Sequence, residues 1–236
     1  MEDNIVNFRG IKFYNYKFDK LFSIINEGGY LVAPAASALT LIEKDQKYYD
    51  SLVKSDVAIL DSGFFCILLR LFKKKKVTKF SGYLFLKSFL NLNFNEETKF
   101  LSIDPNNKES EINISYLKST NIRNLKNYIA PKYDKNIKDE ILLDIVKKYE
   151  PRYIIVNLGG GIQESLALYI KNNINHKCSI LCTGAAIAFL TKKQAPINDI
   201  IDKLYLGWLV RSIYNPKKHL INTIKSLSLI KQFFKN

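Results

Sequence analysis

Residues 153–161 decide the fold, and they read Tyr-Ile-Ile-Val-Asn-Leu-Gly-Gly-Gly. The first six are mostly apolar, with β-branched residues among them, which favours a buried strand. The glycines predict a tight turn, and a helix is expected over residues 163–171. A strand that runs through a glycine turn into a helix is the building unit of an α/β fold.

The same alternation of short strands and helices continues on both sides of this stretch. It predicts an α/β fold with a mostly parallel sheet that helices cover on both faces. The other expected strands are residues 30–33, 57–60, 100–103 and 179–183, and the other helices are residues 37–55, 64–72, 109–118 and 137–149. The last helix is expected to carry Ile141, Leu142, Ile145 and Val146 on one face. Residues 128–134 are interpreted as a loop region, and residues 199–236 as two helices that divide at Asn215-Pro216.

Ligands of such sheets bind beyond the carboxyl ends of the strands. The ends that we nominate are residues 33–37, 61–63, 104–107, 159–164 and 183–184. The glycine run can bring a phosphate to backbone N–H groups and to the positive end of the next helix. It matches neither Gly-x-Gly-x-x-Gly nor a Walker loop. A tight turn explains it equally well, so both interpretations stay open.

Asp61 follows a strand in the sequence Leu-Asp-Ser-Gly. A carboxylate there can take a proton from an attacking hydroxyl group. It can also cap the helix that begins near Phe64, and the sequence alone favours the cap.

No metal site or cofactor is predicted. The chain has no Asp-x-Asp pair, whereas a divalent metal on a sugar diphosphate usually needs neighbouring carboxylates. Cys66, Cys178 and Cys182 are interpreted as free core thiols, since His176 near the last two brings no fourth ligand at finger-like spacing.

The charge is strongly positive and unevenly distributed. The chain has 36 Lys and Arg against 22 Asp and Glu, a net charge of +14. Such an excess attracts nucleic acid, an anionic bilayer or a phosphorylated small molecule. No acidic residue follows Asp202, whereas seven basic residues do: Lys203, Arg211, Lys217, Lys218, Lys225, Lys231 and Lys235. Half of the net charge therefore lies in the last 34 residues.

The end of the chain has the pattern of a helix that lies on a membrane surface. Apolar residues recur at helical spacing from Leu220 to Phe234, and lysines occupy much of the remainder. A helix that packs on the domain and exposes its lysines to water is the alternative. Residues 64–76, an apolar stretch followed by four lysines, form a second such element.

The location that we expect is cytoplasmic, free or attached to a membrane surface. There is no secretory signal and no apolar stretch near the roughly 20 residues that a spanning helix needs. Nucleic acid is not favoured as a partner, because no recognition motif accompanies the positive charge.

Short blocks that follow one another along the chain carry a resemblance to a known family. They are Val32-Ala33-Pro34-Ala35, Leu60-Asp61-Ser62, Lys79-Phe80-Ser81-Gly82, residues 159–164, the segment from Gly184, and residues 194–196, 206–211 and 215–218. In this register, over about residues 30–219, the chain resembles the WecG/TagA/CpsF family of bacterial glycosyltransferases. The family's blocks read Thr-x-Asn, Pro-Asp-Gly, Arg-Val-Thr-Gly, Gly-x-Pro-Lys-Gln-Glu, Gly-Gly-Ala-Phe-Asp, Arg-Ala-Pro, Leu-Glu-Trp-Leu-x-Arg and Glu-Pro-x-Arg.

The resemblance implies a Rossmann-like fold and an inverting, metal-independent enzyme. Such an enzyme moves an N-acetylhexosamine-type sugar, N-acetylmannosamine or its uronic acid, from a UDP donor to an acceptor on undecaprenyl diphosphate, in cell-surface polysaccharide synthesis. The resemblance also divides the chain into an α/β domain over residues 1–198 and an appendage over residues 199–236. The appendage helps to complete the active site and to hold the enzyme on the inner face of the cell membrane. Such enzymes often self-associate, so a homo-oligomer stays an option.

The resemblance also implies roles for single residues. Asp61 is the implied general base. The implied substrate-binding residues are Lys79, Gly160, Gly161, Gln163, Glu164, Thr183, Gly184, Arg211, Lys217 and Lys218. Lys79 stands where the family has an arginine that faces the donor phosphates, so it keeps the charge but loses the bidentate fork.

The chain also departs from the family's pattern. Ala33 and Ala35 replace the polar Thr and Asn, and Leu84 and Ala188 stand where aspartates are usual. A glycine-rich turn has become Asp-Pro-Asn-Asn over residues 104–107. We therefore expect a divergent member with a changed donor or acceptor. The alternative is a catalytically silent, membrane-associated relative.

Overall fold

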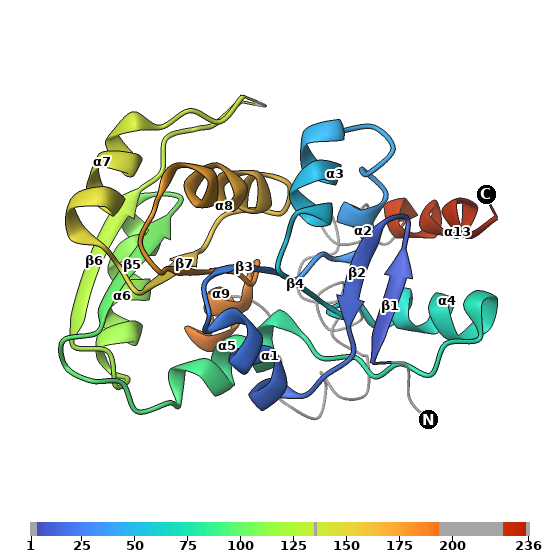
Figure 1. The fold of residues 1–236 in the computed structure, drawn as a ribbon, viewed down its shortest axis with the longest axis horizontal. Helices are drawn as coiled ribbons and strands as arrows, with labels where there is room; N and C mark the ends of the chain where they lie inside the picture. The colour runs from blue at the N-terminus through green and yellow to red at the C-terminus, as the bar shows by residue number, and fades with distance from the viewer. Residues whose placement is uncertain (1–3, 135, 194–223, 235–236) are drawn as a thin grey trace.

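The computed structural model describes residues 4–134, 136–193 and 224–234, and they build an eight-stranded sheet with helices on both faces (Figure 1). The strand order is β1-β2-β4-β3-β8-β7-β5-β6. The strands are β1 Ile5–Phe8, β2 Ile11–Tyr14, β3 Gly29–Val32, β4 Val57–Ile59, β5 Lys99–Asp104, β6 Asn124–Ile129, β7 Tyr153–Val156 and β8 Ser179–Cys182. All pair in parallel except β1 with β2. This is the mostly parallel α/β sheet that the sequence predicts.

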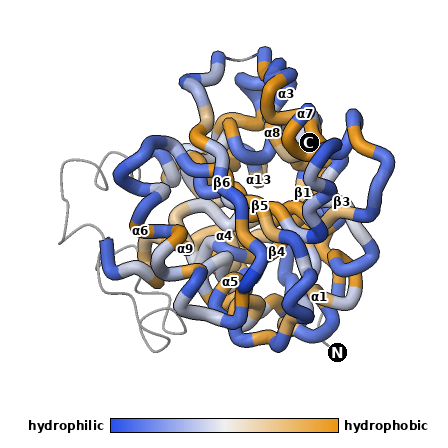
Figure 2. Tube along the Cα trace, turned by 90° about the vertical axis from the view of Figure 1, so that its left-hand side faces the viewer, coloured by the Kyte–Doolittle hydropathy of each residue, from blue (hydrophilic) through white to orange (hydrophobic). Residues whose placement is uncertain are grey.

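The helices divide into two layers, one on each side of the sheet. One layer is α2 Ala36–Leu39, α3 Gln46–Val53, α4 Gly63–Lys73, α7 Glu140–Tyr149, α8 Ile162–Asn173 and α13 Leu229–Phe233. The other is α1 Phe18–Ile25, α5 Gly82–Leu90, α6 Asn107–Lys118 and α9 Ala186–Leu190. Each layer buries its own apolar cluster against the strands. Apolar segments accordingly gather towards the middle of the molecule and polar ones along its outer turns (Figure 2).

Sequence reasoning missed the hairpin of β1 and β2, although its signal is present. Buried and exposed residues alternate along both strands, with Val6, Phe8, Ile11 and Phe13 inside. The two residues between the strands, Arg9 and Gly10, have φ of 54° and 82°. Positive φ at both turn positions gives the twist that a two-residue hairpin needs. The hairpin extends the sheet next to β4 through a parallel pairing.

Other differences from the expected elements have local causes. The helix expected over residues 37–55 is two helices, because Asp45 accepts a hydrogen bond from the Tyr48 N–H (3.1 Å) and starts α3 anew. The prediction missed α1 and α5. It also missed β6, an outer strand with a polar sequence that lacks the signal of a buried strand. Ile141 is 69% exposed, so it does not share the buried face of α7.

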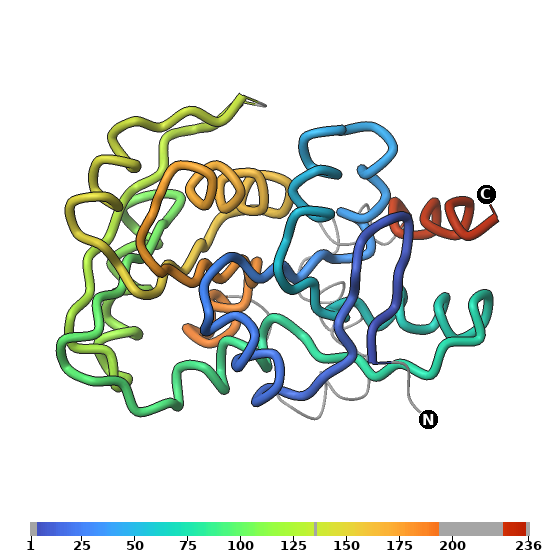
Figure 3. The backbone as a smooth tube through the Cα atoms, in the orientation of Figure 1, coloured from blue at the N-terminus to red at the C-terminus, as the bar shows by residue number. Residues whose placement is uncertain are grey.

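Of the tail, the structure describes residues 224–234, and one side of them packs on the domain. Leu229 and Phe233 are buried in the apolar cluster, and α13 contacts α2 and α4. The Phe233 ring lies 4.7 Å from that of Phe8, centroid to centroid. On the other side, Ile224, Leu227 and Phe234 are exposed. In Figure 3 this last segment lies at the same end of the molecule as β1 and α4. Arg211, Lys217 and Lys218 lie outside the described residues.

The neighbouring phenylalanines of the tail provide a direct test of this packing. Phe233 is 6% exposed and Phe234 is 68% exposed. Phe233→Ala should lower the free energy of unfolding by about 3 kcal/mol, because it leaves a cavity in the core. Phe234→Ala should change it by less than about 0.5 kcal/mol. Urea unfolding of the full chain measures both, and equal effects would contradict this packing.

Candidate active site at the ends of the strands

The strand ends meet at a change of direction in the chain. After β3 the chain passes to α2 in one layer, and after the neighbouring β8 it passes to α9 in the other. In sheets of this kind the crevice between two such loops is where ligands bind. The ends of β4 and β7 flank it, since β4 pairs with β3 and β7 pairs with β8.

Asp61 follows β4 and contacts the beginning of α5. Its Oδ1 accepts a hydrogen bond from the Gly82 N–H (2.9 Å), and the side chain remains partly exposed. The cap of α4 is the neighbouring residue, Ser62, whose Oγ accepts from the Phe65 N–H (3.2 Å). The capping role that the sequence favours for Asp61 is therefore wrong. Its carboxylate lies instead at the positive end of α5.

Gly82 brings that end of α5 close to the ends of β3 and β8. A Cβ at position 82 would lie 2.8 Å from the Thr183 carbonyl oxygen and 3.1 Å from the Ala33 Cβ. Only a residue without a side chain fits this spacing without movement of the backbone. The contact places Asp61, Ala33 and Thr183 around one point, as expected from the positions of their strands.

Gln163 and Glu164 connect the turn after β7 to the turn after β8. Gln163 Oε1 accepts from the Gly184 N–H (3.1 Å), and its Nε2 donates to Glu164 Oε1 (3.0 Å). Glu164 Oε2 accepts from the Gly161 N–H (2.6 Å). Both side chains are buried. Gly161, Glu164, Gln163 and Gly184, which the resemblance assigned to substrate binding, thus form one chain of hydrogen bonds. In this chain Glu164 holds the glycine turn.

In the glycine run, the backbone conformation requires glycine at position 161, whereas positions 159 and 160 are exposed. Gly161 has φ of +94°, which other residues rarely adopt. Among the described residues, a Cβ at Gly159 would meet no atom within 4 Å, and one at Gly160 would meet only the Ala38 Cβ at 3.9 Å. Both are exposed. Packing in the described part of the chain does not demand glycine at 159 and 160, so the phosphate-binding interpretation stays open beside the tight turn.

Two buried polar atoms at the ends of β7 and β8 have no hydrogen-bond partner among the described residues: Asn157 Oδ1 and Thr183 Oγ1. Buried polar atoms are nearly always paired. Tyr48 Oη, His176 Nε2 and Gln232 Oε1 also lack a partner in the described part of the chain, so the position of Asn157 and Thr183 at the strand ends is what makes these two candidates for contact with a ligand. Sequence reasoning named Thr183 but missed Asn157. Its signal was a single amide in an otherwise apolar strand.

The end of β5 is filled by protein groups. Asp104 is fully buried and accepts hydrogen bonds from the side chains of Ser102 (2.9 Å), Ser110 (3.0 Å), Asn113 (2.7 Å) and Asn157 (2.9 Å). Its oxygens therefore fix α6 and β7 to β5. The end of β5 therefore has a structural role, unlike the other nominated strand ends. Asp104 also orients the Asn157 amide: its Nδ2 group is bound, and its Oδ1 has no hydrogen-bond partner among the described residues.

Removal of the Asp104 carboxylate should therefore cost much stability. Asp104→Ala leaves several buried donors without an acceptor, and we expect it to lower the free energy of unfolding by about 3 kcal/mol. Asp144→Ala is the control, because Asp144 is 69% exposed and its ion pair with Lys148 is a surface pair. Chemical denaturation compares the two, and a loss below 1 kcal/mol for Asp104→Ala would contradict the role of this network.

Lys79 lies on the segment that enters α5. The Phe80 N–H donates to the Leu60 carbonyl oxygen (3.1 Å), which holds this segment against the end of β4. The charges of Lys79 and Asp61 both act on the Cys66 thiol. Burial raises the pKa of Cys66 to about 12; Arg70 and Lys79 lower it, and Asp61 raises it. Lys79 is thus in electrostatic reach of the same region as Asp61.

Four of the departures from the family's pattern lie on elements at the ends of β3, β4 and β8. Ala33 is 7% exposed at the end of β3, and Ala35 precedes α2. Leu84 lies in the first turn of α5 and Ala188 in α9. At these four positions the chain carries apolar side chains where the resemblance implies hydroxyl, amide or carboxylate groups.

The residues 4–134, 136–193 and 224–234 contain no group of three or more His, Cys, Asp or Glu placed to hold a metal ion. Over the same ranges Cys66, Cys178 and Cys182 are free and buried, as predicted. No described helix is both long and apolar enough to cross a bilayer.

The fold defines a doubly wound α/β protein, and the candidate residues Asp61, Thr183 and the glycine run follow the carboxyl ends of its strands. The chain belongs to the Glycosyl transferase WecG/TagA/CpsF family, because the sequence model of that family matches residues 6–235. It is therefore related to transferases of polysaccharide synthesis. A comparison with curated proteins gave no match.

The buried Glu164 should make stability depend on pH in a defined direction. Burial raises the pKa of Glu164, against the hydrogen bonds from Gln163 and Gly161, which lower it. A raised pKa means that the protonated form is favoured in the folded state. Protonation of Glu164 therefore stabilises the folded protein. This stabilisation is fully present below the pKa of Glu in the unfolded chain, about 4.3, and is lost as the pH rises through the higher pKa of Glu164 in the folded protein.

The test compares the free energy of unfolding of the wild type with that of Glu164→Gln. Their difference, wild type minus variant, should fall as pH rises from about 4 towards 8. Glu111→Gln, at an exposed position on α6, controls for loss of a carboxylate. A difference that does not change with pH, or that rises, would contradict the burial of Glu164.

Proposed function

We propose that the protein is an inverting, metal-independent glycosyltransferase whose general base is Asp61. The observation that carries the proposal is the placement of this carboxylate: it is partly exposed and held by the Gly82 N–H (2.9 Å) at the crevice between β3 and β8. A base must be both accessible and oriented, and this residue meets both conditions.

In the proposed reaction Asp61 removes the proton from the acceptor hydroxyl group. The oxygen then attacks the anomeric carbon of the donor sugar from the side opposite the leaving group. The bond between that carbon and the diphosphate oxygen breaks, and the diphosphate leaves with the electron pair. Lys79, the Gly160 N–H group and the positive end of α8 are suited to stabilise its charge.

The donor that we propose is a UDP-linked N-acetylhexosamine, and the acceptor a sugar on undecaprenyl diphosphate, in cell-surface polysaccharide synthesis. Thr183, Gly184 and the Asn157 amide are candidates for contact with the donor. Residues 199–236 are proposed to complete the site as an appendage to residues 1–198, with Arg211, Lys217 and Lys218 towards phosphates. The enzyme would work at the inner face of the membrane, where such an acceptor is anchored.

The apolar side chains at the end of β3 support a second candidate function, a relative that has kept the fold and lost turnover. Ala33 and Ala35 offer no hydrogen bonds to a sugar, and loss of such groups weakens recognition of a hydroxylated ligand. Calorimetry with UDP-sugars distinguishes the two. Measurable affinity supports the enzyme, and none for any donor supports the silent relative.

The base is tested with Asp61→Asn. The amide can still accept from the Gly82 N–H, so the fold should be retained, while release of nucleoside diphosphate should fall about 10²- to 10⁴-fold. The assay combines a panel of nucleotide sugars with a lipid-linked acceptor. Asp144→Asn, at a 69% exposed site, should keep full activity. Turnover by Asp61→Asn equal to the wild type would refute the assignment.

A further inference from the structure

The polar side chains that follow β7 and β8 lie next to each other. Ile155 of β7 pairs with Leu181 of β8, so the same register two residues further places Asn157 opposite Thr183. Residues paired in a parallel sheet point to the same face, and neighbouring strands lie about 5 Å apart. The two side chains are therefore immediate neighbours at the carboxyl ends of their strands.

One further residue on each side completes a row across four strands. The register of β3 with β8 places Ala33 beside Thr183. The register of β5 with β7 places Asp104 beside Asn157, and the Asn157 N–H donates to the Ile103 carbonyl oxygen (2.9 Å), so this pairing continues to the end of β7. The Ala33 side chain offers no hydrogen bond, and Asp104 uses its oxygens inside the protein. Asn157 and Thr183 are the members of the row that can bind a ligand.

The orientation of the Asn157 amide is fixed by its protein partners. Its Nδ2 group donates to Asp104 Oδ1 (2.9 Å) and to Ser102 Oγ (3.0 Å). The Ser102 hydroxyl group donates its own hydrogen to Asp104 Oδ2 (2.9 Å), so it can only accept from Asn157. A carboxylate has no hydrogen to donate, so an amide turned over would bring two acceptors together. Asn157 therefore presents Oδ1, and not Nδ2, away from this network.

The pair consists of one fixed acceptor and one hydroxyl group. Asn157 is 8% and Thr183 5% exposed, and neither Asn157 Oδ1 nor Thr183 Oγ1 has a hydrogen-bond partner in the described part of the chain. A buried polar atom that stays without a partner costs free energy. The Asn157 oxygen can be satisfied only by an O–H or N–H group, and the neighbouring hydroxyl group can donate or accept.

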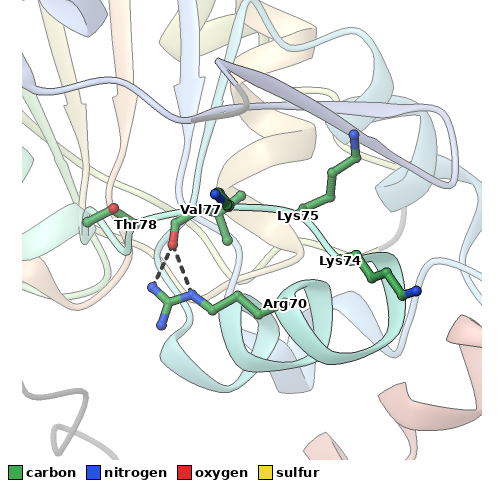
Figure 4. Close-up of a pocket in the computed structure, with 6 residues that line it drawn as sticks. Arg70, Lys74, Lys75, Val77 and Thr78 are labelled. Carbon is green, nitrogen blue, oxygen red and sulfur yellow. Dashed lines mark hydrogen bonds between the residues drawn. The ribbon is translucent and has the colours of Figure 1, made fainter. Parts of the chain in front are cut away.

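This row does not suit a phosphate or a carboxylate. The oxygens of an ionised phosphate only accept hydrogen bonds, as does Asn157 Oδ1. The described hydrogen-bond partners of the Asp104 and Asn157 side chains are serine and asparagine groups and each other, without a lysine or an arginine. Basic side chains gather elsewhere, past the end of α4, where a cavity of about 510 Å³ is lined by Arg70, Lys74, Lys75, Lys76, Val77 and Thr78 (Figure 4).

We propose that Asn157 and Thr183 form a specificity-determining pair that binds an uncharged O–H or N–H group of the donor substrate. The inference rests on the proposed function and deepens it, because it states which kind of group the donor presents at the ends of β7 and β8. Ser102 and Asp104 are positioning residues, since they fix which atom of the Asn157 amide faces the ligand. Two parts of a nucleotide sugar carry such groups, the transferred sugar and the nucleoside, whereas the ionised diphosphate between them does not.

The experiment is calorimetric titration of the full chain with UDP-N-acetylmannosamine and, separately, with UDP. Asn157→Ala and Thr183→Val should each weaken the affinity for the nucleotide sugar about tenfold, the effect of one lost hydrogen bond. Thr183→Ser keeps the hydroxyl group and should restore it. An equal loss for UDP assigns the bound group to the nucleoside, and a loss confined to the nucleotide sugar assigns it to the transferred sugar. Unchanged affinity for both ligands in both variants would overturn the proposal.

Asn113 provides a matched control for the network behind the pair. It is buried on α6, and its Nδ2 group also donates to Asp104 Oδ1 (2.7 Å). Asn113→Ala and Asn157→Ala each remove one amide donor from Asp104, so both should lower the midpoint of urea unfolding. Only Asn157→Ala should weaken binding of the donor. Equal losses of affinity would mean that Asn157 acts through the network alone, against a direct contact.

Thr183→Val also tests whether the hydroxyl group is available to a ligand. In the absence of ligand this variant should unfold at the same temperature as the wild type or at a higher one, because it removes a buried polar atom that has no described partner. A clear decrease would show that the protein itself binds this hydroxyl group, and it would overturn the assignment of Thr183.

Failure of this inference and failure of the proposed function give different results. Asp61→Asn should bind the donor as the wild type does while it releases little nucleoside diphosphate. An active wild type whose KM for the donor is the same in Asn157→Ala and Thr183→Val overturns the pair alone. Affinity that depends on the pair, together with turnover that does not depend on Asp61, overturns the base alone. No affinity for UDP or for any UDP-sugar overturns both.

Discussion

The close approach of α5 to the ends of β3 and β8 is the constraint on which the site depends. It is made by a missing side chain, since any Cβ at Gly82 would meet the Thr183 carbonyl oxygen at 2.8 Å. The same residue donates its N–H to Asp61. One glycine therefore sets the distance between a helix and two strands and also fixes the direction of the carboxylate.

Two further polar arrangements hold the surroundings of this contact. Gln163 ties the turn after β8 to α8, and Glu164 ties the turn after β7 to the same helix. Asp104 closes the neighbouring end of β5 with four side-chain donors. Because these groups are buried, their hydrogen bonds are shielded from competition with water. The β5 side of the candidate site is thus held by buried hydrogen bonds, whereas Gly159 and Gly160 are exposed.

The sequence was sufficient for the architecture because buried parallel strands are continuous apolar runs, such as residues 153–158. It failed at the margins of the sheet. β6 is polar because it is an outer strand, and β1 was too short to be recognised without its hairpin turn.

For the site, the strand ends were predictable from topology. The partner of Asp61 was not, because Gly82 lies 21 residues away and α5 was not anticipated. Asn157 was visible as an isolated amide, but its unpaired oxygen depends on Asp104, which no local pattern reveals.

The composition of β6 also has a bearing on how copies of this protein meet. In the described residues β6 pairs with β5 alone, so its other side presents a row of backbone donors and acceptors. Lys126, in the middle of this strand, is exposed, with its ammonium group 4.2 Å from the centre of the Tyr149 ring. A cation at the centre of a sheet margin opposes edge-to-edge association. Joining of two copies through their β6 edges is therefore disfavoured, so this side of the sheet is protected from pairing with another strand.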